Sequence, residues 1–113
     1  MLRHLYEDAL EQRRKEYGVS DSRTAQAARD LGLFLSRQND QPGARLALSE
    51  ALQIDEKSLG VTAAQTLADA ADLASVSPPA EAEPLWQRTA RSANAQVAAR
   101  SLIALGGLHA AGQ

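Results

Sequence analysis

Cysteine is absent from the 113 residues, and residues that favour β-strands are rare. Without cysteine there can be no disulfide, no thiolate zinc site and no cysteine nucleophile. Val and Ile together number six and the aromatic residues four, whereas Ala contributes 23 residues and Leu 16. Because Ala and Leu favour helices while β-branched and aromatic residues favour strands, the composition predicts an all-α protein.

A basic stripe and a long apolar run are also missing. Twelve basic and fourteen acidic residues are mixed along the chain, which gives a net charge of −2. Nucleic-acid binders usually concentrate Lys and Arg on one face. No apolar run approaches the roughly 18 residues that span a bilayer, and no signal peptide opens the sequence. We therefore expect binding to neither nucleic acid nor membrane, with the cytoplasm as the default location.

Segments of the sequence recur at a regular spacing. The segment from Tyr6 to Val19 returns 42 residues later as the segment from Leu48 to Val61. A second module, residues 30–35, returns at 104–109, and a degenerate copy lies at 69–74. Self-similarity at a period of roughly 20 to 50 residues is typical of solenoid proteins.

Turn and cap residues divide the sequence into six expected helices. Gly18 and Gly60 each follow a long periodic segment, where glycine can adopt the left-handed conformation that ends a helix. Side chains that accept from the first free N–H groups of a helix precede the next ones; the expected caps are Ser20 or Asp21, Asp40 and Ser77. The helices are expected at 2–17, 21–38, 41–59, 62–75, 79–92 and 95–111.

Apolar side chains recur three and four residues apart in the first and third of these helices, so each helix has one face suited to packing. Arg13 and Asp55 end the two stripes, where the aliphatic part of a charged side chain extends the apolar face. The stripes are Leu2, Tyr6, Ala9, Leu10 and Arg13, and then Ala44, Leu48, Ala51, Leu52 and Asp55.

These residues resemble the tetratricopeptide repeat, in particular the variety of about 42 residues found in kinesin light chains and many bacterial proteins. Leu31-Gly32 matches the leucine-glycine pair of the family's first helix, and Leu35 matches a site that is often aromatic. Ala44, Leu48 and Ala51 follow the pattern of the second helix. Residues 82–88 look like the opening of the second helix in kinesin light chains.

The resemblance implies an α-α superhelix, a solenoid of about six antiparallel helices in a single domain. It implies the second helix of one repeat at 2–17, full repeats at 21–59 and 62–92, and the first helix of a further repeat at 95–111. Six core positions are expected to be buried in the first full repeat: Leu31, Gly32, Leu35, Ala44, Leu48 and Ala51.

Three features depart from the family pattern. Ala70-Ala71 stands where the middle repeat should have leucine-glycine, and we expect one residue to be missing from the turn at 76–80. The third spacing falls near 35 residues. No polar capping helix is visible at either end, although repeat arrays need one to cover their terminal faces. We therefore expect a fragment of a longer array.

No catalytic, metal or cofactor site is expected. His4 and Asp8 are spaced as two ligands on one helix, but no third ligand accompanies them, so a solvated histidine is the better interpretation. His109 lies far away in the sequence. Asp69 and Asp72 could meet on one helix, where repulsion would raise the pKa of one carboxyl; a ligand-facing role and an exposed polar face both remain open for them.

A partner-binding groove is implied by the resemblance, because the first helix of each repeat lines the concave side in this family. The groove positions in the three repeats are Gln26, Arg29, Asp30, Leu33, Ser36 and Arg37, then Gln65, Ala68, Asp69, Asp72 and Ser75, and finally Arg100, Ile103, Gly107 and Ala110. A grip on a terminal carboxylate is not expected, since Leu33 replaces the asparagine of such grooves and the two aspartates would repel an anion. The alternative is that all these residues are merely solvated.

The sequence therefore predicts a scaffold that binds a protein or peptide partner in this groove. The alternative is a structural spacer or oligomerisation segment of a larger regulatory protein, and a small helical enzyme is a remote third. A homodimer through the terminal helices is a further expectation, since uncapped apolar faces favour association. Its contacts would come from Leu2, Leu5, Tyr6 and Leu10 at one end and from Leu102, Leu105, Leu108 and Gly106-Gly107 at the other.

Overall fold

The computed structural model describes residues 2–91 and 95–111, with side chains for 2–91 and 96–106. Within these residues it is all-α and contains no strand, as the composition predicts. The helices are α1 (Leu2–Tyr17), α2 (Ser22–Arg37), α3 (Gln41–Ser58), α4 (Ala64–Ser75), α5 (Pro79–Thr89) and α6 (Ala95–Ala111). The expected boundaries agree to within three residues, except that the end expected for the fifth helix, residue 92, lies outside the described residues.

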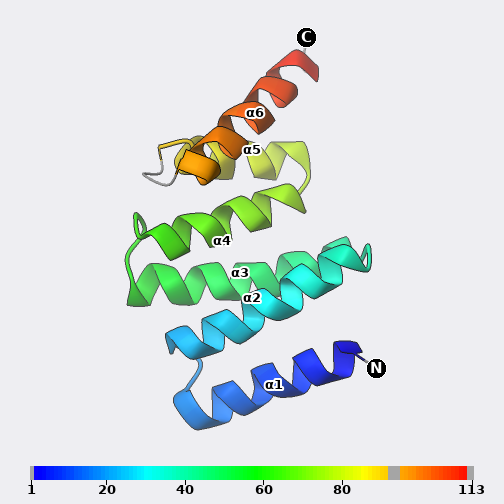
Figure 1. Ribbon diagram of the computed structural model, residues 1–113, viewed down its shortest axis with the longest axis vertical. Coiled ribbons are helices and arrows are strands. Elements are labelled where there is room, and N and C mark those ends of the chain that lie inside the picture. The colour runs from blue at the N-terminus through cyan, green and yellow to red at the C-terminus, as the bar shows by residue number, and fades with distance from the viewer. Residues whose placement is uncertain (1, 92–94, 112–113) are drawn as a thin grey trace.

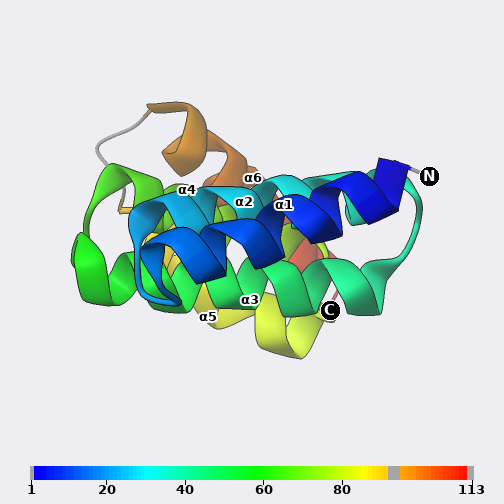
Figure 2. The same ribbon diagram turned by 90° about the horizontal axis from the view of Figure 1, so that it is seen from below.

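Each helix packs against the next one in chain order, and α4 also contacts α6. Figure 1 shows the helices stacked along the longest dimension of the molecule, which measures 47 Å, from α1 at one end to α6 at the other. In the view of Figure 2, α2, α4 and the first part of α6 lie toward one side and α3 and α5 toward the other. The molecule therefore offers two broad surfaces, the α2/α4/α6 side and the α3/α5 side.

Local sequence explains most of the helix ends. Gly18 and Gly60 follow α1 and α3 with φ angles of 92° and 98°, the left-handed conformation expected of them. Asp21 accepts from the N–H of Arg23, and Asp40 accepts from the N–H of Gly43, so both expected caps are confirmed.

The cap expected at Ser77 is wrong. Pro78 occupies the N-cap of α5, and its ring offers no acceptor there. The Ser77 hydroxyl instead donates to the Leu73 carbonyl oxygen at 2.7 Å, which closes the end of the preceding helix. Ser77 lies between α4 and α5 and could cap either helix; its hydroxyl bonds to the C-terminal end of α4.

The main core lies between α2 and α3, and all six core positions expected from the sequence are buried in it. Leu48 is completely covered, and Gly32 on the facing helix lets it approach the α2 backbone. Tyr6 of α1 stacks on Phe34 of α2 with ring centroids 4.9 Å apart. A second cluster joins α4, α5 and α6 through Ala71, Ala74, Ala82 and Trp86.

The 42-residue repeat is visible in individual hydrogen bonds. The Thr24 hydroxyl of α2 donates to the Gly18 carbonyl oxygen at 2.6 Å and shares this hydrogen with the Arg13 carbonyl oxygen of α1 at 3.2 Å. The Thr66 hydroxyl of α4 donates to the Asp55 carbonyl oxygen of α3, also at 3.2 Å. Both donors and both acceptors are 42 residues apart. Both junctions therefore bring a threonine hydroxyl to the equivalent carbonyl oxygen, and Thr24 makes its shorter bond to Gly18 in addition.

The middle repeat is shorter by a helical turn, so the expectation of one residue lost from the turn at 76–80 is wrong. Helix α2 has 16 residues and α4 has 12, a difference of four, while three residues follow each of them before the next helix begins. The register set by Thr24 and Thr66 pairs Leu31-Gly32 with Leu73-Ala74 rather than with Ala70-Ala71. The sequence alone did not reveal this register, because several alignments fit equally well in a segment rich in alanine.

The structure divides the apolar residues expected at the two ends of the stack. Leu10 is buried, so it is not available for association as expected, and Tyr6 is half-buried. Leu105 is half-buried and packs against the cluster around Trp86. Leu2, Leu5 and Leu102 are exposed, whereas the side chain expected at position 108 lies outside the described part of the chain.

Candidate functional site

Three of the groove residues expected from the sequence meet in a charged bridge across α2, α4 and α6. Asp72 of α4 accepts from Arg29 Nε of α2 at 3.2 Å and from Arg100 Nη1 of α6 at 3.2 Å. Asp72 is nearly covered, whereas Arg100 is close to half exposed. Trp86 of α5 lies beside Arg100, with the guanidinium carbon 5.6 Å from the ring centroid. The Arg29–Asp72–Arg100 bridge thus holds together three helices that are far apart in the sequence.

Asp69 lies next to the bridge and is completely buried. Its Oδ1 atom accepts from Gln65 Nε2 at 3.0 Å and lies 3.6 Å from Arg29 Nε. Burial, followed by the neighbouring Asp55 carboxyl, raises the pKa of Asp69 to about 8 against the lowering effect of Gln65 and Arg29. The sequence predicted a raised pKa for Asp69 or Asp72 through their mutual repulsion. The pKa of Asp69 is indeed raised, but the causes are burial and Asp55, not Asp72.

Asp55 is the member of this buried acidic pair that sequence reasoning did not single out. It is buried on α3, 14 residues before Asp69, and faces α4 across the junction between the two repeats. The sequence did contain a signal for its burial, because Asp55 continues the apolar stripe on the packed face of its helix. The stripe was interpreted as ending in a snorkelling side chain, although an aspartate is too short to reach solvent in that way.

The other expected groove residues surround the bridge with varying exposure. Gln26 donates to Asp30 at 2.9 Å, and both are exposed on α2. Arg37 and Ile103 are exposed, while Leu33, Ser36 and Ala68 are half-buried. Ser75 donates to the backbone carbonyl of Asp72 at 2.6 Å. The side chains at positions 107 and 110 lie outside the described part of the chain.

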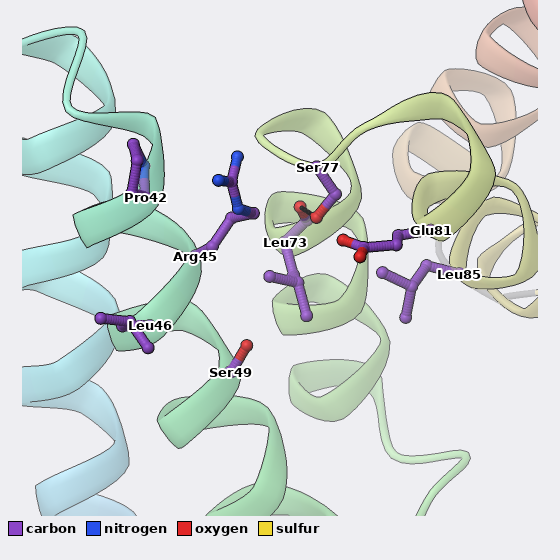
Figure 3. A pocket seen from close by; sticks show the side chains of 8 residues that line it. All are labelled: Pro42, Arg45, Leu46, Ser49, Leu73, Ser77, Glu81 and Leu85. Carbon is purple, nitrogen blue, oxygen red and sulfur yellow. Dashed lines mark hydrogen bonds between the residues drawn. The ribbon is translucent and has the colours of Figure 1, made fainter.

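The opposite side of the molecule carries an open groove between α3 and α5, with a volume of about 450 Å³. Figure 3 shows Arg45 and Ser49 of α3 facing Glu81 and Leu85 of α5, with Leu73 of α4 at the base. Arg45 also donates to the Val76 carbonyl oxygen at 3.0 Å, which ties α3 to the end of α4. This α3/α5 groove was not expected from the sequence, because its walls come from helices of different repeats.

A second hollow of about 370 Å³ lies between α1 and α3. Glu50 accepts there from Arg14 Nε at 3.1 Å, and this bond raises the pKa of Arg14 above its ordinary value. Leu46 lines both hollows and is 76% exposed. It is therefore the most prominent apolar side chain of the α3/α5 side.

No protein-family model matches this chain, and no curated protein matches it either. Its function must therefore be inferred from the chemistry of its own residues. Among the described residues, no group of three or more His, Cys, Asp or Glu side chains is arranged to hold a metal ion. His4 Nε2 lies 3.2 Å from Asp8 Oδ2, and both side chains are exposed. None of the described helices combines the length and the apolar character needed to cross a bilayer.

Proposed function

We propose that this chain is a non-catalytic, cytoplasmic scaffold of the tetratricopeptide type that binds a peptide or helix of a partner protein along its α2/α4/α6 side. Support for the repeat type comes from the paired hydrogen bonds of Thr24 and Thr66 and from the paired left-handed glycines. The close contact between Gly32 and Leu48 adds the small-against-large packing on which the resemblance depends. A superhelical arrangement of these hairpins is part of the proposal.

The observation that carries the binding proposal is the Arg29–Asp72–Arg100 bridge. It fixes two guanidinium groups on a common carboxylate before any partner arrives. A surface whose side chains are already ordered loses less conformational entropy when it binds. The bridge therefore holds the polar groups of this surface in one arrangement, which lowers the entropy cost of binding a partner.

The chemistry around the bridge suits an extended segment with both polar and apolar groups. Arg100 gives one N–H to Asp72, and its other N–H groups can donate to carbonyl or carboxylate oxygens of a partner. Ile103, one turn further along α6, is 76% exposed and offers an apolar contact. Main-chain carbonyls with an apolar side chain nearby are what a peptide presents.

Peptide selection followed by NMR mapping tests this proposal. Peptides enriched on the immobilised protein are titrated into ¹⁵N-labelled protein, and perturbed signals are assigned. We expect the perturbations to gather on α2, α4 and α6, with the Arg29 and Arg100 Nε–H signals among them. Perturbations confined to the α3/α5 groove would contradict the proposed site, and failure to select any peptide from a diverse library would contradict peptide binding.

A second candidate function, an oligomerisation element, is favoured by a separate observation. Leu2 and Leu5 are exposed on α1, and Leu102 and Ile103 are exposed on α6. Figure 1 places these two helices at opposite ends of the stack. Exposed apolar clusters commonly mark association sites, so a homodimer through these helices remains part of the proposal.

A further inference from the structure

Asp55 and Asp69 occupy positions where the preceding repeat has no acid. The Thr24 and Thr66 bonds define the equivalence: Asp55 corresponds to Arg13, and Asp69, three residues after Thr66, corresponds to Ala27. The same junction is therefore built in the first repeat without any buried carboxyl. The architecture does not require this acid pair, so its chemistry calls for a separate explanation.

The surroundings of Asp69 leave one of its oxygens unsatisfied unless the carboxyl carries a proton. Oδ1 is occupied by Gln65 and lies near Arg29, whereas Oδ2 is buried and has no hydrogen-bond partner among the described residues. Asp55, also buried, is the neighbouring acid on α3, and a hydrogen bond between the two carboxyls is one of the causes that raise the pKa of Asp69. Two carboxylates can only accept, so such a bond needs one proton between them.

We propose that Asp55 and Asp69 share one proton across the α3–α4 junction, and that its loss loosens this junction and pulls Arg29 away from Asp72 toward Asp69. While the proton is present, it forms a hydrogen bond between the Asp55 carboxyl of α3 and the Asp69 carboxyl of α4. Once it has left, two buried negative charges face each other, and the nearest cation is Arg29, 3.6 Å from Oδ1. The inference concerns the folded chain alone and needs no bound partner.

The charged groups of each neighbouring helix fit this behaviour. Helix α2 contributes Arg29, which Asp69 and Asp72 compete for, and α3 contributes Asp55. Helix α6 contributes Arg100, which pairs with Asp72 and would keep that carboxylate in place after Arg29 has moved. On α5, Arg88 is paired with Glu56 of α3 at 3.0 Å and is therefore already engaged.

The direction of the pH effect follows from the raised pKa. The pKa of Asp69 rises from 3.8 to about 8, so between these values the folded chain holds a proton that the unfolded chain has released. The contribution of this group to stability is therefore most favourable below pH 3.8, decreases as the pH rises and becomes constant above about pH 8. At neutral pH this group therefore lowers the free energy of unfolding, because Asp69 must take up a proton when the chain folds.

Asp69→Asn tests the proposal, because an asparagine amide has nearly the shape of the protonated carboxyl and can donate to Asp55 at every pH. We compare urea unfolding of the two proteins from pH 5 to pH 9. The ratio of the unfolding constants, wild type over variant, should rise by up to about tenfold per pH unit and level off above about pH 8. The matched control Asp30→Asn changes an exposed carboxyl on α2 and should not reproduce this rise.

The contrary result is equally clear. If the Asp69→Asn variant is less stable than the wild type throughout the range with no change in slope, Asp69 is an ionised partner of Arg29 and the proposal is wrong. A direct measurement on the wild type covers the case of a variant that does not fold. By ¹³C NMR, one aspartate carboxyl should titrate near pH 8, together with the ¹⁵N signal of Arg29 Nε. Titration of every aspartate below about pH 5 would overturn the shared proton.

Discussion

A Cβ atom added to residue 32 would lie 2.6 Å from Cγ of Leu48 and 2.8 Å from its Cδ2, closer than such atoms approach in proteins. Gly32 is therefore a point at which α2 and α3 come into close contact within their hairpin. The glycine is needed for space and not for backbone freedom, since its helical conformation is open to any residue.

The first prediction concerns this contact. Gly32→Ala gains about 1 kcal/mol of helix propensity but forces Leu48 to shift, which costs roughly 1–3 kcal/mol. We expect a net loss of stability, larger for Gly32→Leu, measured by urea unfolding. Gly106 on α6 has open space around its Cα, so Gly106→Ala is a matched control that should be neutral or stabilising. Equal stabilisation by both alanines would contradict the close contact.

The second prediction uses the repeated threonine bonds. Thr24→Val and Thr66→Val each remove a hydroxyl that donates to backbone carbonyls at or just after the end of the preceding helix while keeping the shape of the side chain. Each variant should lose about 1 kcal/mol, measured by chemical denaturation, and the losses should add in the double variant. A loss confined to one of the two positions would show that the junctions are not equivalent.

The third prediction concerns the Arg29–Asp72–Arg100 bridge. Asp72→Asn leaves two guanidinium groups without their carboxylate, and we expect a loss of about 1 kcal/mol because both arginines remain partly solvated. The loss should shrink as salt is raised from 0.05 to roughly 0.5 M. Asp30→Asn, at the equivalent exposed position of the preceding repeat, is expected to have little effect. Equal losses in the two variants would remove the special role of Asp72.

Sequence reasoning succeeded where a local rule decides the outcome. Gly18, Gly60, Asp21 and Asp40 act through their own backbone neighbourhood, so their roles followed directly from the chain. The core positions followed from helical periodicity. The charged bridge was anticipated only as a set of residues on one side, because pairing between α2, α4 and α6 depends on the rotation of each helix.

Failures occurred where two helices compete or where a helix changes length. Ser77 could cap either neighbour, and only the packed turn decides between them. The shortened α4 moved the middle repeat's register in a segment rich in alanine, where several alignments look alike. Asp55 was seen on the packed face, but its partner Asp69 lies across a junction that the sequence does not place in space.

The fourth prediction concerns self-association. If the exposed leucines of α1 and the exposed residues of α6 dock on one another, Leu5→Glu should shift a dimer to the 12 kDa monomer in equilibrium sedimentation. Leu5 is suitable because it is 63% exposed, so its substitution should leave the fold intact. Leu105 is unsuitable, because it packs on the cluster around Trp86. A wild type that stays monomeric at high micromolar concentration would contradict the association.

The binding proposal can be tested with a pair of variants matched in exposure. Ile103 on the α2/α4/α6 side and Leu46 on the α3/α5 side are each 76% exposed, so a glutamate at either position should leave the fold intact. Affinity for a selected peptide is measured by fluorescence anisotropy for the wild type, Ile103→Glu and Leu46→Glu. We expect Ile103→Glu to weaken binding by roughly tenfold or more, equivalent to about 1.4 kcal/mol, and Leu46→Glu to bind as the wild type does. Weaker binding in Leu46→Glu with no change in Ile103→Glu would contradict the account.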